Sequence, residues 1–269
     1  MALSDGTRAA ITYGSAAIVV GALGVASLGW WVPELRRQAV AAPGERIEVA
    51  FIDPPVWMAP QDLAPLQEMV AREAGPAAGG REGLLRAKAA LEKSGWFDEV
   101  RQVSRSGFSG IEVDAVFAEP VALVVHSNAE HLLDTSCRRM PRSYPVGMGP
   151  RLTRILGVAA APPAHAGSAW SGADVIAGVE MAKLVGVQRW RGQVEAVDVG
   201  DFASSGNVAL LTSKQSRIIW GRMPGTEAAA EVPSAQKLRY LDMLVSQYGR
   251  IDGAGPQSID LSGDYVGSR

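Results

Sequence analysis

The spacing of hydrophobic and polar positions changes along the chain, and the first pattern is an uninterrupted apolar run. Residues 11–32 are 22 residues without a charge, and a helix of that length spans about 33 Å, the thickness of a bilayer core. Trp30 and Trp31 end the run as an interfacial aromatic belt, and Arg36 and Arg37 follow. The pattern predicts a tail (1–10), one transmembrane helix (11–32) and a linker (33–46).

Two other interpretations of this run are weaker. A helix in the core of a soluble protein is the first, but an uncharged stretch of this length has no polar face to offer water. A cleaved signal peptide is favoured by the small residues Ala39, Val40 and Ala41. Its apolar region, however, is normally only about 7–15 residues long. We therefore expect an uncleaved signal anchor that binds the lipid bilayer through residues 11–32.

The orientation of the anchor does not follow from flanking charge. Arg8 and Asp5 lie before it, whereas Arg36 and Arg37 lie after it, which slightly disfavours a cytoplasmic N-terminus. A long following domain is nevertheless translocated largely regardless of local charge. We expect a single-pass protein of the cytoplasmic (inner) membrane, with a cytoplasmic N-terminus and its bulk periplasmic or otherwise extracytoplasmic.

Beyond the linker, residues 47–119 predict a first domain. Apolar and polar residues alternate over 47–51, which indicates a strand. Two helical patterns follow, over 63–70 and 84–91, and two more alternating stretches run over 96–103 and 111–117. The predicted order is strand, helix, helix, strand, strand, with both helices covering the apolar face of a three-stranded sheet.

Residues 120–269 predict a second, β-rich domain. Helical patterns occupy 173–185 and 234–248, and Ala, Pro, Gly and Ser over 159–172 indicate a loop. The strand candidates are 121–125, 132–134, 144–146, 194–199, 208–212, 217–220, 258–261 and 265–266. The expected fold class is therefore α+β: one transmembrane helix, a β-α-α-β-β domain, and a mixed β domain with two flanking helices.

Charge and cysteine content exclude some functions. The chain has 26 Lys and Arg against 28 Asp and Glu, so the basic surface of a nucleic-acid-binding protein is not expected. Cys137 is the only cysteine, which rules out an intrachain disulfide and a cysteine-based zinc site. As a catalytic thiol it would need one of His126, His131 or His165, and no spacing links them. The alternative is a small buried hydrophobic residue.

Motifs of enzyme chemistry are missing from the sequence. There is no His-x-x-x-His pair and no phosphate-binding Gly/Lys loop, and residues 167–172 lack the spacing of a nucleophile elbow. Asp53, Glu119, Asp134, Asp198 and Asp260 are interpreted as solvated or turn-capping carboxylates. We expect no enzyme activity, no cofactor, no metal and no small-molecule substrate.

Two stretches of the chain carry motifs of a known family. The first runs from Leu84 through Gly95-Trp96-Phe97 to Glu119-Pro120-Val121-Ala122. The second joins Lys237-Leu238 and Leu241 to Ile259-Asp260-Leu261. The first is similar to the helix, the aromatic-led strand and the "E-R-x-P-V-A" strand exit of the FtsQ/DivIB family of bacterial cell-division proteins, and the second resembles its "K-L-x-x-L" helix and "I-D-L-R" strand. The resemblance implies a polypeptide-transport-associated (POTRA) domain followed by a β domain.

The chain also departs from the family pattern at several positions. Phe117 and Ala118 stand where Glu and Arg would be expected. Cys137 replaces the glycine that usually follows Leu133-Asp134, and Ser262 replaces the final arginine. The loop over 159–172 is longer than is usual in the family.

The end of the chain is the expected binding site. Because short strands follow the last helix, one sheet edge is expected to keep unpaired backbone groups that accept a partner strand by β-augmentation. The resemblance implies that the partners are the extracytoplasmic parts of FtsB and FtsL, in the divisome at the septum. On this interpretation the docking edge and its side-chain contacts are Ile259, Asp260, Leu261 and Ser262, with Tyr248, Tyr265 and Val266.

Three alternatives remain open from the sequence. The same terminal residues can instead close the core of their own domain. The protein can be a different POTRA-bearing protein of envelope translocation or outer-membrane assembly, although such proteins generally repeat the domain or add a barrel. It can also be a membrane-anchored envelope enzyme, which a deep pocket with convergent carboxylates or a histidine pair would support.

Overall fold

A computed structural model describes residues 47–75, 80–107, 109–253 and 257–263. The expected tail, transmembrane helix and linker over 1–46 lie outside these residues, as does the expected strand at 265–266. Within the described ranges, no helix combines the length and apolar character needed to cross a bilayer.

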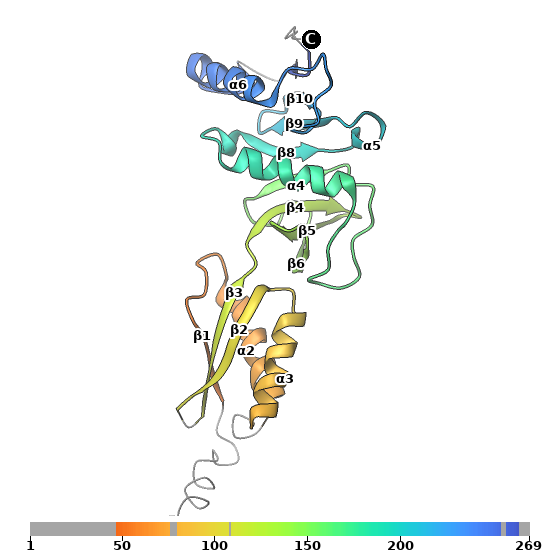
Figure 1. The fold of residues 1–269 in the computed structure, drawn as a ribbon. Coiled ribbons are helices and arrows are strands. Elements are labelled where there is room, and N and C mark those ends of the chain that lie inside the picture. Colours follow the sequence, from red (N-terminus) through yellow and green to blue (C-terminus); the bar gives the residue numbers. More distant parts are fainter. Residues whose placement is uncertain (1–46, 76–79, 108, 254–256, 264–269) are drawn as a thin grey trace, which may run out of the picture. The chain divides into compact units, whose positions relative to one another are not determined.

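The first part of the chain forms a three-stranded sheet with two helices (Figure 1). Its elements are β1 (Glu48–Phe51), α2 (Pro60–Ala74), α3 (Arg81–Lys93), β2 (Phe97–Ser106) and β3 (Gly110–Phe117). The strands lie in the order β1-β3-β2, and β1 runs parallel to β3. The predicted order of strand, helix, helix, strand, strand is confirmed.

Apolar periodicity explains why these elements fold together. Leu66 and Val70 are four residues apart on α2 and are both buried, and Leu91 of α3 is buried as well. On β3, Ile111 and Val113 are buried whereas the residue between them is exposed. Amphipathic helices and a one-sided sheet strand therefore bury their apolar faces in this domain.

The second part of the chain forms an eight-stranded mixed sheet, in the order β11-β10-β9-β8-β7-β4-β5-β6. The strands are β4 (Pro120–His126), β5 (Ala129–Asp134), β6 (Arg139–Pro145), β7 (Thr153–Leu156), β8 (Val194–Asp198), β9 (Val208–Thr212), β10 (Arg217–Gly221) and β11 (Ser258–Asp260). Strands β4, β7 and β8 are parallel neighbours, and β10 is parallel to β11. The α+β class is thus as expected.

The strand β7 is a correction to the sequence-based interpretation, which assigned no element between 147 and 158. It is only four residues long, and only Ile155 in it is fully buried. Thr153 and Arg154 interrupt the apolar pattern because the Arg154 side chain pairs with the buried carboxylate of Glu130. A four-residue central strand with two adjacent apolar residues, Ile155 and Leu156, has no alternation that a sequence pattern can detect.

One face of the large sheet carries the helices α4 (Ala173–Gly186) and α6 (Ser234–Tyr248). Figure 1 shows α4 lying across the strands β4 and β8. Alternating strand residues, such as Ala122 and Val124, join the buried faces of both helices in one core. The α4 backbone approaches β7 closely, since a Cβ on Gly178 would lie 2.5 Å from a methyl carbon of Ile155.

Two short helices were not predicted: η2 (Arg191–Gln193) and the single turn α5 (Phe202–Ser205). The loop over 159–172 is irregular, as predicted, and it makes one isolated bridge, from Ala169 to Arg138. The chain divides into two compact units. The first contains 47–75, 80–88 and 102–114, and the second contains 89–101 and the residues from 115 onwards.

Candidate partner-binding edge

The strand β11 forms one edge of the eight-stranded sheet. The Arg217 amide donates to the Gln257 carbonyl (3.0 Å), and the Leu261 amide donates to the Ile219 carbonyl (2.9 Å). Backbone groups alternate in direction along a strand. The N–H and C=O groups of Ser258 and Asp260 therefore point away from β10, and no described residue hydrogen-bonds to them.

The opposite edge, formed by β6, is protected. Pro141 and Pro145 have no N–H to donate to an added strand. The loop over 159–172 lies alongside the start of β6. The Arg139 amide donates to the Ser168 carbonyl (3.0 Å), and the Gly167 amide donates to the Arg139 carbonyl (2.7 Å). The two edges of the sheet thus differ in their ability to accept a partner strand.

The predicted site residues divide into two groups. Ile259 and Leu261 are only 4% and 2% exposed, and their side chains belong to the core of their own domain. Asp260 and Ser262 are half-buried, and Tyr248 is 54% exposed at the end of α6. The other two, Tyr265 and Val266, lie outside the described residues.

Asp260 ends the edge with a side-chain turn. Its Oδ1 accepts hydrogen bonds from the amide (2.8 Å) and the hydroxyl (2.6 Å) of Ser262. The Ser262 carbonyl in turn accepts from the Val232 amide at 3.2 Å. The segment after β11 is therefore fixed against the chain that leads into α6.

A small pocket of about 260 Å³ opens beside the end of β11. Its apolar wall consists of Val232, Tyr240, Met243 and Leu261, and Arg239 contributes a cation. Met243 is half exposed there. The pocket offers a side-chain binding position next to the outward-facing backbone groups of β11.

A buried lysine lies at the same end of the strand. Lys237 of α6 is 1% exposed, and its Nζ donates to the Trp220 carbonyl and to Glu231 Oε1, both at 2.6 Å. The ammonium also lies 5.1 Å from the centre of the Trp220 ring. Burial opposes ionisation of Glu231, but hydrogen bonds from Lys237 and from backbone amides outweigh it and lower the pKa of Glu231.

A second buried ionic cluster lies at the other end. The Asp252 carboxylate is fully buried and accepts from Arg250 Nε (2.6 Å), Arg250 Nη2 (2.8 Å) and the Thr212 hydroxyl (2.6 Å). Burial raises the pKa of Asp252, but the bonds from Arg250 and Thr212 outweigh it, so the pKa lies below its usual value. This cluster ties the segment before β11 to the end of β9.

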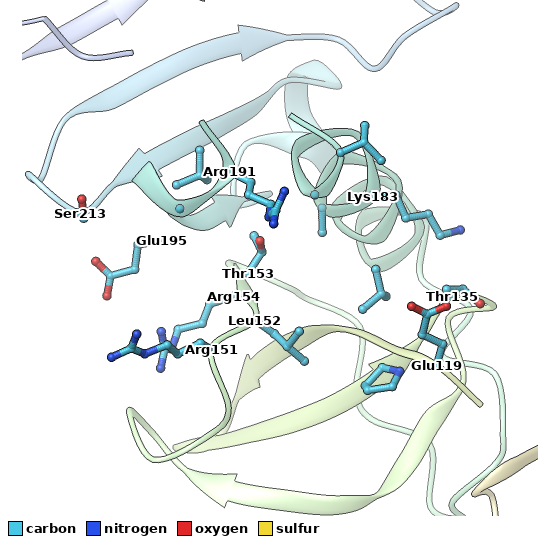
Figure 2. A pocket seen from close by; sticks show the side chains of 17 residues that line it. Glu119, Thr135, Arg151, Leu152, Thr153, Arg154, Lys183, Arg191, Glu195 and Ser213 are labelled. Carbon is cyan, nitrogen blue, oxygen red and sulfur yellow. The ribbon is translucent and has the colours of Figure 1, made fainter. Parts of the chain in front are cut away.

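A larger cavity of about 780 Å³ lies at the amino ends of β4, β7 and β8 (Figure 2). Charges of both signs line it. Glu119 and Glu195 lie on opposite sides, with Leu152 and Thr153 between them. None of its lining residues is a histidine. The cavity therefore does not bring together a carboxylate pair or a histidine pair.

Two of the carboxylates considered for chemistry have ion-pair partners. Asp198 pairs with Arg217, and Asp134 pairs with Arg138. Burial raises the pKa of the Cys137 thiol, which disfavours the reactive thiolate. Among the described residues, no group of three or more His, Cys, Asp or Glu side chains could hold a metal ion.

Sequence reasoning missed the two buried ionic clusters. One signal was present: Lys237, Leu241 and Leu244 share one face of α6, which places a lysine in an apolar stripe. Thr212 and Asp252 are 40 residues apart in the sequence, so no local pattern connects them.

No protein-family model matches the sequence, and no curated protein matches it.

Proposed function

We propose that this protein is a membrane-anchored scaffold of bacterial cell division, of the FtsQ/DivIB type, located at the septum. Residues 11–32 anchor it in the cytoplasmic membrane. A POTRA-like domain (47–119) and a β domain (120–269) lie outside the cytoplasm. FtsB-like and FtsL-like partners bind the β domain by strand addition, without a cofactor or a small-molecule substrate.

The observation that carries this proposal is the difference between the two edges of the large sheet. Backbone groups of Ser258 and Asp260 point outward from β11, whereas prolines and a loop protect β6. Proteins normally blunt exposed edges because these recruit other strands. A sheet with one blunted edge and, among the described residues, an opposite edge without a partner strand has the feature expected of a strand-addition site.

The pocket beside β11 adds a means of selection. In strand addition, backbone pairing supplies affinity and pockets for alternate side chains supply specificity. Tyr240, Met243 and Leu261 offer apolar surface for one large side chain of the partner, and Arg239 offers a positive charge to an acidic neighbour.

A proline at an outward-facing position tests the proposal. In Ser258→Pro the lost N–H is one that faces the partner, so pairing of β11 with β10 is retained. Capture of the FtsB-like protein of the same organism by the full-length chain should weaken at least about tenfold, the effect of losing one backbone hydrogen bond and its register. Ser258→Ala, which keeps the N–H, should bind normally. Undiminished capture by Ser258→Pro would overturn the strand-addition assignment.

A further inference from the structure

We propose that Lys237 and Asp252 are positioning residues that hold β11 on β10 before a partner strand pairs with its outer edge. The inference rests on the proposed function, because it explains how the docking edge is ready before a partner arrives. Neither residue supplies an outward-facing backbone group; those groups belong to Ser258 and Asp260.

The strand β11 is too short to hold its own place. It has three residues, β10 is its one paired strand in the part of the chain that the structure describes, and the pairing is parallel. Parallel pairs are slightly less stable per residue than antiparallel ones, and an edge strand has half the backbone hydrogen bonds of a central strand. Burial of Ile259 and Leu261 contributes to holding it, but burial is not directional, so its register depends on the segments on either side.

At the start of β11, the Asp252 cluster fixes the incoming chain. Thr212, at the end of β9, donates to Asp252, and its hydroxyl also accepts from the Ser216 amide at 3.2 Å. The Ser216 hydroxyl then accepts from the Gln257 amide at 3.2 Å, directly before β11. A continuous set of hydrogen bonds thus runs from the β9–β10 hairpin to Gln257, the residue before the edge strand.

At the end of β11, Lys237 fixes the outgoing chain. It binds the Trp220 carbonyl and Glu231 together, and Glu231 accepts from the Arg222 amide at 2.8 Å. A Cβ on Gly221 would lie 2.2 Å from Glu231 Oε1 and 2.9 Å from the Ser262 side chain. At Gly221, the end of β10 is therefore in close contact with Glu231 and with Ser262 after β11.

The chemistry of these clusters is better suited to fixing the position of β11 than to stabilising the fold. Removing charges from water is costly, and apolar side chains of similar volume are often equally or more stabilising. An apolar residue cannot, however, bind a carbonyl and a carboxylate in fixed directions. Directional bonds at both ends are what a short, one-sided strand requires.

Hydrogen exchange in the full-length protein tests the inference without any partner. In Asp252→Asn and in Lys237→Met, the Leu261 amide, which donates to β10, should exchange at least about tenfold faster, since each variant loses a charged hydrogen bond. The amide of Val124, in a central strand, should be unchanged. Equal acceleration at both amides would mean general destabilisation and would overturn the proposal, as would no acceleration at Leu261.

A matched control lies near the opposite edge of the same sheet. Glu130 is as buried as Asp252 and pairs with Arg154 at the same 2.6 Å distance that joins Arg250 to Asp252. Glu130→Gln should leave the Leu261 amide unchanged. If it accelerates Leu261 as strongly as Asp252→Asn does, β11 has no dedicated anchors.

Two conservative substitutions at Thr212 keep the test valid if the charge-removing variants do not fold. Thr212→Val removes the hydroxyl between Asp252 and Ser216 at nearly constant volume, whereas Thr212→Ser keeps it. The Leu261 amide should exchange faster in the valine variant and normally in the serine variant. Failure of the serine variant to restore slow exchange would contradict the positioning role.

The two proposals can fail separately. Faster Leu261 exchange in the variants, combined with no capture of an FtsB-like protein by the wild type, would keep the anchors and reject the proposed function. Capture by the wild type that weakens in Ser258→Pro, combined with unchanged Leu261 exchange in Asp252→Asn and Lys237→Met, would keep the docking edge and reject the anchors.

Discussion

Ionised carboxylates are buried near both edges of the eight-stranded sheet. Glu130, Glu231 and Asp252 all have pKa values below their usual range. Burial acts in the opposite direction in each case, and hydrogen bonds from Arg154, Lys237 and Arg250, together with other donors, outweigh it. The folded protein therefore binds protons at these sites less readily than the unfolded chain.

The sign of this linkage predicts acid lability. A carboxyl group with a lowered folded pKa stabilises the fold fully above its unfolded pKa, about 4, and the contribution is lost as the pH falls through the folded pKa. The free energy of unfolding in urea should therefore decrease steadily below about pH 4. Asp252→Asn should show a shallower decrease than the wild type, and an equal slope would contradict the assignment.

The environment of His131 predicts a second pH dependence of stability, which an NMR titration of this ring can follow. Burial lowers the pKa of His131 below its usual value, and the neighbouring Arg139 and His126 lower it further. The folded state thus favours the neutral ring, and this contribution is lost as the pH falls from above the unfolded pKa of about 6.5. An NMR titration should give a midpoint for His131 below the value in the urea-unfolded chain; a midpoint above it would refute the prediction.

At the scale of elements, the contact between α4 and β7 makes a prediction that opposes helix propensity. Alanine is favoured over glycine in a helix by up to about 1 kcal/mol. At Gly178, however, the new Cβ would overlap Ile155, and overpacking costs about 1–3 kcal/mol. Gly178→Ala should therefore lower the free energy of unfolding.

Gly186 supplies the control for that measurement, because nothing lies within 4 Å of the Cβ that alanine would add there. Gly186→Ala, at the end of the same helix, should be neutral or slightly stabilising in urea unfolding. A stabilising effect of Gly178→Ala equal to that of Gly186→Ala would show that α4 is not closely packed on β7.

The elements differ in how far the sequence predicts them. The strand β9 and the helix α6 have the predicted bounds because their apolar patterns are regular and glycine ends α6. The strand β7 escaped prediction because its pairing partners, β4 and β8, are distant in sequence and its Arg154 serves a buried ion pair.

Regular apolar patterning also made part of the candidate site predictable. The strand at 258–261 follows from its pattern, and period-two alternation distinguishes buried Ile259 and Leu261 from Ser258 and Asp260. Which edge of the sheet stays open depends on the order of eight strands and on a loop from another part of the chain. Those long-range pairings leave no local pattern.

At the scale of the whole molecule, the sheet is asymmetric: β6 is covered or interrupted by proline, and β11 is ordered but vacant among the described residues. The proposed binding function and the anchoring role of Lys237 and Asp252 both depend on this asymmetry. A partner that binds elsewhere would leave the outward groups of β11 exchanging freely with water.

The most direct test is the exchange rate of the Asp260 amide in the full-length protein, with and without a saturating FtsB-like partner. That amide points away from β10, so it should exchange fast in the free protein. Pairing with a partner strand should slow it at least about tenfold. Binding of the partner with no change at Asp260 would contradict strand addition at β11.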